Sequence, residues 1–246
     1  MMSNRVALSI AVLSIGCGDN VRTGPDAPSV ATQNLIAQIS VSSDGDSNLV
    51  AIGASFSDAQ DPEQNISLDP EDSLSATLRG QTLAVIQYRP LVALPDEPLG
   101  EPYEAFFDID PPIVTSEDVV FELVRHRWDS TTVTVTIPGF AIDPVTSPAS
   151  RASDLVVAWS PVDDSPMSYV VYGDTWLAPV VGHVDVPGDG SLTVPAKSLT
   201  SNANPTVTVS AGVAFERDAK IPVGAPFAGG QITTAFTARA LFTSTP

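Results

Sequence analysis

The sequence is poor in cysteine, histidine and basic residues, and each shortage excludes a class of protein. Cys17 is the only cysteine, so no disulfide framework can hold the chain together. The two histidines, His126 and His183, lie far apart in the sequence and outside any ligand-spaced motif, which argues against a zinc site. Only 11 basic residues accompany 29 acidic ones, and the net charge of −18 repels phosphate backbones, so nucleic acid is not expected as a partner.

Motifs for catalysis are also missing. No Gly-x-Ser-x-Gly turn accompanies either histidine, and Gly229-Gly230 leads into a strand-like segment rather than a phosphate-binding helix. Paired carboxylates, which glycoside hydrolysis requires, arise by chance in any acidic β protein. The sequence therefore predicts a protein that is not an enzyme and needs no cofactor, with a carbohydrate-active enzyme as the least favoured alternative.

Among the features that are present, the N-terminus has the layout of an export signal. Arg5 precedes a short apolar run, Val6 to Ile15, which is too short to span a bilayer, and no later apolar run is long enough either. The run ends in Leu13-Ser14-Ile15-Gly16-Cys17, which resembles the lipobox of bacterial lipoproteins. The resemblance implies that residues 1–16 are a signal peptide and that Cys17 carries the lipid anchor. The alternatives are a plain secretory signal or a cysteine buried in a folded N-terminus.

The rest of the chain divides into a tether and a series of short strands. Residues 17–33 are rich in Gly, Pro, Ser and Thr, which predicts a flexible lipidated tether. Beyond them, strand-like runs alternate with turn residues, and no segment has a sustained helical period. In residues 132–137 threonines alternate strictly with Val133, Val135 and Ile137, as expected of a half-buried antiparallel strand.

The strand pattern restarts after Pro138, and this restart suggests a domain boundary. We expect an all-β protein with two consecutive immunoglobulin-like antiparallel β-sandwich domains, at residues 34–138 and 139–246. One large sandwich is the alternative. The stretch Leu155-Val156-Val157-Ala158-Trp159-Ser160-Pro161, followed by Tyr169 and Tyr172, resembles two strands of a fibronectin type III or related immunoglobulin-like module. That resemblance implies that Trp159 lies in the core of the second domain.

A string of further blocks is similar to a group of lipoproteins of Gram-negative bacteria that has no assigned activity. The blocks include Asp72-Ser73-Leu74-Ser75-Ala76, Phe121-Glu122-Leu123-Val124-Arg125, Gly190-Ser191-Leu192-Thr193-Val194-Pro195 and Phe227-Ala228-Gly229-Gly230-Gln231-Ile232. The resemblance implies an exported, membrane-anchored β protein and implies no reaction. By the sorting rule for lipoproteins of enteric-type bacteria, Gly18 after the cysteine points to the outer membrane.

Acidic turns are the first kind of candidate binding site. Asp44, Asp46 and Asn48 offer oxygen ligands at alternate positions, as calcium loops do, although the central glycine and bidentate glutamate of an EF-hand are missing. Further acidic turns lie at Asp58, Asp61 and Glu63 and at Asp69, Glu71 and Asp72. Since Asp, Asn, Gly and Ser also form ordinary turns, a structural role is the simpler interpretation.

Exposed aromatic side chains could recognise a ligand. Trp128 lies on a charged turn and Trp176 in a loop beside Gly173 and Asp174, so either could present an exposed ring. Covering one end of a sandwich is the simpler alternative for both.

The sequence thus predicts a lipid-anchored envelope protein with a structural, adhesive or ligand-recognition role. An envelope protein or a glycan is the expected partner, in addition to the membrane. A periplasmic lipoprotein that binds a solute or glycan is the alternative.

Overall fold

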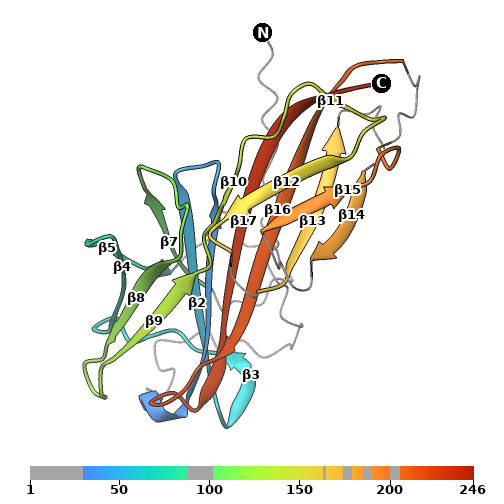
Figure 1. Ribbon diagram of the computed structural model, residues 1–246. Helices are drawn as coiled ribbons and strands as arrows, with labels where there is room; N and C mark the ends of the chain where they lie inside the picture. The colour runs from blue at the N-terminus through green and yellow to red at the C-terminus, as the bar shows by residue number, and fades with distance from the viewer. Residues whose placement is uncertain (1–29, 88–101, 163–164, 174–178, 185–189, 200–205) are drawn as a thin grey trace, which may run out of the picture.

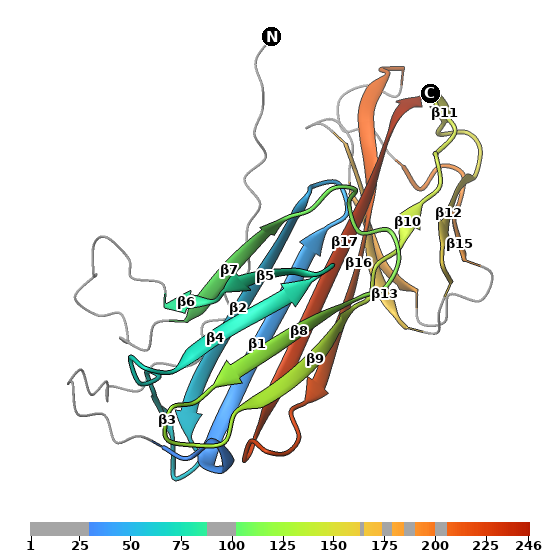
Figure 2. The ribbon, with the colours of Figure 1, turned by 90° about the vertical axis from the view of Figure 1, so that its left-hand side faces the viewer.

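The structure is a computed structural model, and it describes residues 30–87, 102–162, 165–173, 179–184, 190–199 and 206–246. Cys17 and Trp176 therefore lie outside the described residues. The described chain is built from β-strands, which confirms the all-β prediction; its one helical element is the single 3-10 turn Thr32–Asn34. The strands form two lobes that lie end to end (Figure 1, Figure 2).

The first lobe is a sandwich of two sheets. One sheet has four strands in the order β5 (Gln81–Ala84), β4 (Ser73–Leu78), β8 (Glu117–Val124) and β9 (Thr131–Ile137). The other belongs to a ten-stranded sheet and contains β6 (Ile86–Gln87), β7 (Tyr103–Asp108), β2 (Leu49–Asp58) with β3 (Asp61–Asn65) beside it, β1 (Leu35–Asp44), and parts of β17 (Gly229–Thr245) and β16 (Val209–Pro222).

The second lobe uses the remainder of the same long sheet. There β14 (Val180–Val184), β13 (Met167–Gly173), β16 and β17 are neighbours, and β11 (Ala149–Ser150) pairs with the end of β17. Against them lies a three-stranded sheet of β10 (Ala141–Ile142), β12 (Leu155–Ser160) and β15 (Ser191–Val194).

The two lobes share the hairpin of β16 and β17. These strands are 14 and 17 residues long and pair without interruption from Val209 and Ser244 to Pro222 and Gln231. The part of β17 near residue 229 pairs with β1, whereas β13 pairs with residues 211–216 of β16. Figure 2 shows both strands running the length of the molecule.

The chain passes from the first lobe to the second between β9, which ends at Ile137, and β10, which begins at Ala141. However, the shared hairpin returns to the first lobe, so the range 139–246 supplies strands to both. The two lobes are consequently joined by continuous main chain in addition to the connection at Gly139.

The sheets are antiparallel as expected, except at two strand pairs. Strand β1 pairs with β17 in parallel, from Ile36 and Gly229 to Asp44 and Thr237, and β11 also pairs with β17 in parallel. A tight turn forces neighbouring strands to be antiparallel. Strands β1 and β17 come from opposite ends of the described chain, so no turn sets their relative direction.

The core is continuous through both lobes. Its buried apolar residues form one cluster that extends from Phe56 and Phe121 in the first lobe to Trp159 and Phe215 in the second. Trp159 is 2% exposed and lies 5.0 Å from the ring of Phe215, which confirms its predicted place in the core.

An arginine lies inside the core where the lobes meet. Arg217 is fully buried in β16, and its guanidinium carbon lies 4.8 Å from the ring centre of Phe140. Phe140 in turn packs edge-on against Phe236 of β17 at 5.1 Å. The cation is therefore placed over an aromatic face, which is a favourable contact for a desolvated guanidinium.

Candidate functional site

The predicted calcium loop forms the turn between β1 and β2, and its first carboxylate, that of Asp44, forms an ion pair with an arginine. Arg239 Nη1 lies 2.5 Å from Asp44 Oδ2 and 3.9 Å from Asp46 Oδ2. The main-chain N–H of Asp46 donates to Asp44 Oδ1 at 3.1 Å, as in an ordinary Asx turn. The positive charge beside Asp44 is thus supplied by β17, from a residue 195 positions along the chain.

An aromatic ring and an apolar side chain lie near Arg239 and this turn. They belong to Tyr172 and Leu241. Tyr172, Gly212 and Leu241 lie opposite one another on three adjacent strands of the second lobe. A Cβ on Gly212 would lie 2.7 Å from Tyr172 Cζ and 3.1 Å from Leu241 Cδ2, so both side chains lean over the glycine. We call Asp44, Asp46, Tyr172, Arg239 and Leu241 the junction cluster.

Burial and charge both act on the junction cluster. Desolvation raises the pKa of the Asp46 carboxyl, and the Asp44 carboxylate raises it further, while Arg239 lowers it. Desolvation also raises the pKa of the Tyr172 hydroxyl. Leu241 is 74% exposed. The cluster therefore presents an aromatic ring, a paired arginine and carboxylates on one sheet face, a combination suited to binding polar ligands that also have an apolar side.

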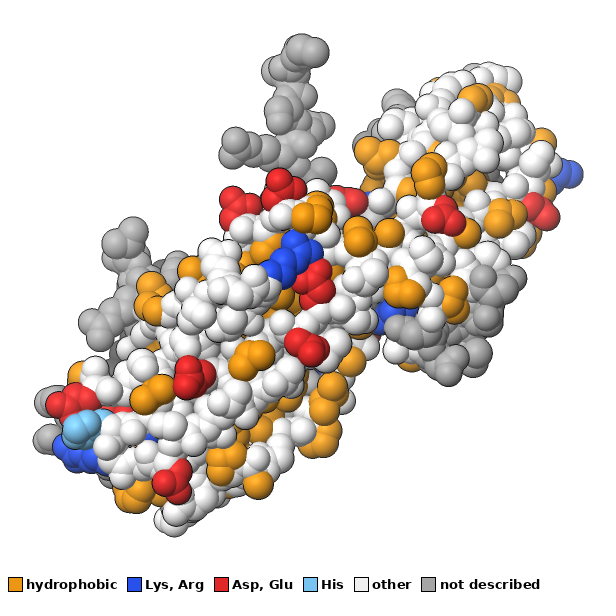
Figure 3. Space-filling view, turned by 60° about the vertical axis from the view of Figure 1, so that its left-hand side comes forward, with side chains coloured by type: hydrophobic (Ala, Val, Ile, Leu, Met, Phe, Trp, Pro, Cys, Tyr) orange, Lys and Arg blue, Asp and Glu red, His pale blue; other side chains and the backbone are white. Residues whose placement is uncertain are grey.

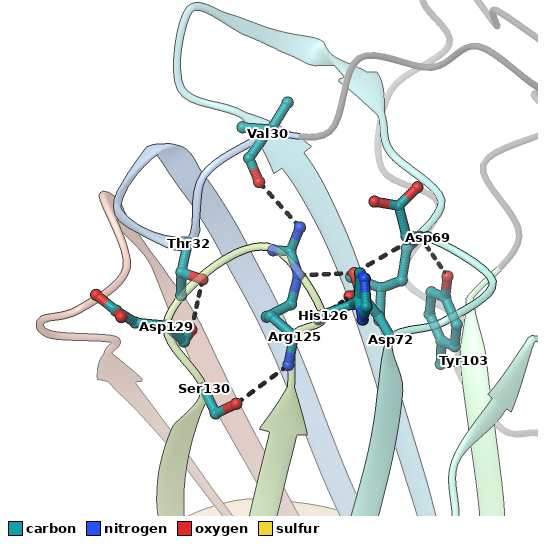
Figure 4. A network of polar contacts seen from close by, with 10 residues as sticks. Val30, Thr32, Asp69, Asp72, Tyr103, Arg125, His126, Asp129 and Ser130 are labelled. Atoms are coloured by element: carbon teal, nitrogen blue, oxygen red, sulfur yellow. Dashed lines mark hydrogen bonds and ion pairs between the residues drawn. The ribbon is translucent and has the colours of Figure 1, made fainter.

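The third predicted acidic turn, at Asp69 to Asp72, forms a buried ion pair instead of a metal site. Arg125 Nε lies 2.7 Å from Asp72 Oδ2, and the two side chains are 3% and 1% exposed. The Asp72 carboxylate also accepts main-chain N–H bonds from His126 at 2.8 Å and from Asp69 at 3.2 Å. Figure 4 shows these partners converging on one carboxylate.

Arg125 also binds the first described residue of the chain. Arg125 Nη2 donates to the Val30 carbonyl at 3.0 Å, and Thr32 Oγ1 donates to the Asp129 carbonyl at 2.8 Å (Figure 4). Residues 30–32 are therefore bound to the turn between β8 and β9. We call Val30, Thr32, Asp72, Arg125 and Asp129 the entry network.

The other candidates lie on the surface and do not come together. Trp128 is 38% exposed, on the same turn as the entry network. His126 Nε2 lies 3.2 Å from Glu71 at an exposed position, and His183 is exposed on β14. Asp58 accepts the N–H of Gln60 at 2.9 Å, and Asp61 and Glu63 are exposed on β3. Asn48 is exposed at the end of the predicted calcium loop.

Neither a metal-binding group of side chains nor a membrane-spanning helix occurs among the described residues. No group of three or more His, Cys, Asp or Glu side chains there is arranged to hold a metal ion. No helix in the described part of the chain is long and apolar enough to cross a membrane.

Sequence reasoning missed the partners of these clusters. Arg239 and Arg125 looked like ordinary strand and turn residues, and no local pattern links either of them to its aspartate. One signal was present: only 11 basic residues occur in this chain, and a scarce arginine inside an alternating apolar segment, as Arg217 and Arg239 are, is a candidate for a specific partner.

Comparison with known proteins gives the chain no family. No protein-family model matches it, and no curated protein matches it. Among solved structures it is similar to one that concerns host cell surface retention of a 1.5-MDa bacterial ice-binding adhesin, with 9% identity, a TM-score of 0.24, and coverage of 86% of this chain and 65% of that one. This chain thus spans less than two thirds of that structure.

Two further structures are similar at the same level. One contains the chicken CNTN1 FN1–FN3 domains, with 10% identity, a TM-score of 0.26, and coverage of 74% of this chain and 62% of that one. The other is CBD12 from CALX1.2, with 7% identity, a TM-score of 0.23, and coverage of 77% and 82%. At such TM-scores the similarity supports no argument about function.

Proposed function

We propose that this chain is a lipoprotein of the bacterial envelope, anchored through Cys17 and used as a rigid, non-catalytic structural or adhesive module. In this proposal residues 1–16 are the signal peptide, residues 17–33 are the tether, and the membrane is the outer membrane. The lipobox-like sequence supports the anchor. The shape and the joining of the two lobes support the structural role.

The observation that carries the proposal is the shared hairpin. Lobes joined by a flexible linker swing relative to one another. Here two continuous strands of 14 and 17 residues cross between the lobes, and one buried cluster fills the junction. Bending at the junction would break the main-chain ladder and open the core around Phe140 and Arg217. The two lobes therefore form one stiff body.

The position of Val30 limits how far this end of the body lies from the membrane. The 3-10 turn lies at the end of the first lobe, and the C-terminus lies at the far end of the second (Figure 1, Figure 2). About 13 residues separate Cys17 from Val30, and such a segment spans at most roughly 45 Å. A lipid at Cys17 would therefore keep the entry network within roughly 45 Å of the membrane.

The anchor is tested by substituting the cysteine. The Cys17→Ser protein should incorporate no labelled fatty acid and should move from the membrane fraction to the soluble fraction. Thr23→Ser, an equally mild change in the tether, should leave both properties unchanged. An unlabelled but still membrane-bound Cys17→Ser protein would show that attachment does not depend on this lipid.

The structural or adhesive role is tested on intact cells. Cells that display the wild-type protein should adhere to a protein-coated or glycan-coated surface, or keep their envelope intact under stress, better than cells that produce Cys17→Ser. The mutant is the matched comparison because its folded part is unchanged and only its retention on the cell differs. Equal behaviour of both strains in all of these assays would refute the role.

Glycan binding is a second candidate function, and the junction cluster favours it. An aromatic ring beside an arginine and carboxylates offers stacking and charge-assisted hydrogen bonds, which are the contacts that a sugar requires. Tyr172→Ala should remove binding to any glycan that the wild-type protein captures from an array. Thr243→Ala, an exposed position on β17 outside the cluster, should leave binding unchanged. If Tyr172→Ala binds as well as the wild type, this site is excluded.

A further inference from the structure

Strand β9 is an edge strand without the usual protection. It covers Thr131–Ile137 at the end of the four-stranded sheet, and among the described strands it pairs only with β8. Its sequence, Thr-Thr-Val-Thr-Val-Thr-Ile, contains no charge, proline or glycine. Natural sheets normally protect an open edge with charges, prolines, bulges or very short strands, because an open edge pairs readily with another strand.

The other end strands of the described sheets are shorter, and β6 and β10 have only two residues each. Strands β5, β14 and β15 are 4, 5 and 4 residues long, against 7 for β9. The open part of β16 beyond Glu216 contains Lys220 and Pro222, both unfavourable for adding a strand. Among the strands that end the described sheets, β9 is therefore the longest, and it carries no charge.

Both faces of β9 have side chains that a neighbouring strand could contact. On the outer face Thr132, Thr134 and Thr136 are exposed. On the inner face Val133 is only half-buried, and together with Thr131 it lines a small apolar recess between the two sheets, which also contains Phe56 and Phe121. An added strand with the same alternation would continue the threonine face and cover the half-buried valine.

We propose that β9 pairs antiparallel with β9 of a second copy of this chain, so that two four-stranded sheets become one sheet of eight strands. Full overlap of residues 131–137 places Thr134 opposite Thr134 of the other copy and Val133 opposite Val135. Threonine pairs and β-branched pairs are favourable across strands, and no like charges face each other within the strand. The sequence of β9 is complementary to itself in this way, which is what a two-fold interface requires.

The charges beside β9 set the conditions for this pairing. On the outer face of β8, Glu122 lies opposite Thr132 and Asp118 lies opposite Thr136. In the paired form, Glu122 of one copy would lie three strand spacings from Asp118 of the other, about 14 Å. The Debye length is about 8 Å at 0.15 M salt and about 30 Å at 0.01 M. Repulsion between the two acidic copies should therefore oppose pairing at low salt and be screened at physiological salt.

Two seven-residue strands form a small interface. Stable dimers in solution bury about 1,200–2,000 Å² or more, so the pairing should be weak for the free protein. Attachment of both copies to one membrane would raise their effective concentration and favour the pair. Only this last step depends on the proposed anchor, and the pairing can be measured without it.

A cross-linking experiment tests the geometry directly. In the full-length chain with Cys17→Ser no other cysteine is present, so one added cysteine reports a single contact. Thr134→Cys in this background should form a disulfide-linked dimer under mild oxidation, because opposed residues in an antiparallel pair have Cα atoms about 4.5–5.5 Å apart, within disulfide range. Thr82→Cys, on the opposite edge of the same sheet, should remain monomeric. Equal cross-linking of the two variants would overturn the proposal.

Sedimentation at high protein concentration tests the pairing without a cross-link. The Cys17→Ser protein should associate at least 10-fold more tightly at 0.15 M than at 0.01 M salt. Thr134→Lys should abolish the association, since it opposes two ammonium groups, whereas Thr82→Lys adds the same charge at the other edge and should preserve it. A monomer at all salt concentrations, or a dimer that Thr134→Lys leaves intact, would refute pairing through β9. Unchanged melting temperatures would establish that both lysine variants are folded.

Discussion

Substitution of Asp72 by alanine is the sharpest test of how the first lobe is held together. The Asp72 carboxylate is 1% exposed and accepts hydrogen bonds from Arg125 Nε and from the main-chain N–H groups of His126 and Asp69. Asp72→Ala removes the acceptor of all three hydrogen bonds at once. It leaves a guanidinium that is 3% exposed without its counter-charge.

The expected cost follows from this burial. Breaking a buried ion pair by removing one partner costs about 3–5 kcal/mol, because the remaining charge stays desolvated. In a protein of this size 1 kcal/mol corresponds to about 2–4 °C in Tm, so Asp72→Ala should lower Tm by roughly 10 °C. The main-chain N–H of His126 is exposed and can bond to water instead, so its lost hydrogen bond should add little to this cost.

Urea unfolding followed by tryptophan fluorescence and circular dichroism measures this loss. Glu117→Ala is the matched control, because it breaks the pair with Arg79, whose side chains are 30% and 20% exposed. Partly exposed pairs contribute about 0–1 kcal/mol. The double variant Asp72→Ala with Arg125→Met should recover part of the loss, since it removes the unpaired charge. If Asp72→Ala costs no more than Glu117→Ala, the argument from burial is wrong.

Three further changes have defined outcomes. Trp159→Ala should lower the free energy of unfolding by about 3–5 kcal/mol, since it removes a core ring packed on Phe215. Gly230→Ala should unfold the chain or separate β17 from β1, as judged by hydrogen exchange, because φ is +132° and the new Cβ would lie 1.8 Å from the Ala37 carbonyl oxygen. Asp46→Asn should raise Tm slightly at neutral pH. Because folding raises the pKa of the Asp46 carboxyl, the folded protein loses stability when this group ionises as the pH rises through that pKa. In acid the carboxyl is protonated, so the difference in Tm between Asp46→Asn and the wild type should vanish.

Local patterns in the sequence were sufficient to predict most strands. The alternation in residues 132–137 reappears as β9, and Trp159 is buried in β12 as expected. These predictions succeed because alternation and β-branched composition act within a few residues. Strand β16 continues to Pro222 through the charged residues Glu216, Arg217 and Asp218, where no local pattern predicts a strand. Uninterrupted pairing with β17 and the ring of Phe140 beneath Arg217 stabilise this segment, and neither is visible locally.

The sequence by itself therefore determined the class of the fold and the places where strands such as β9 and β12 form. The tertiary structure decided which strands meet. It placed Arg239 against Asp44, Arg125 against Asp72, β17 beside β1 in parallel, and β9 at a sheet edge where no further described strand pairs with it. Each of these contacts joins residues tens to almost two hundred positions apart. Their choice depends on the cooperative packing of the whole core, whereas the pattern in a strand depends on the residues of that strand alone.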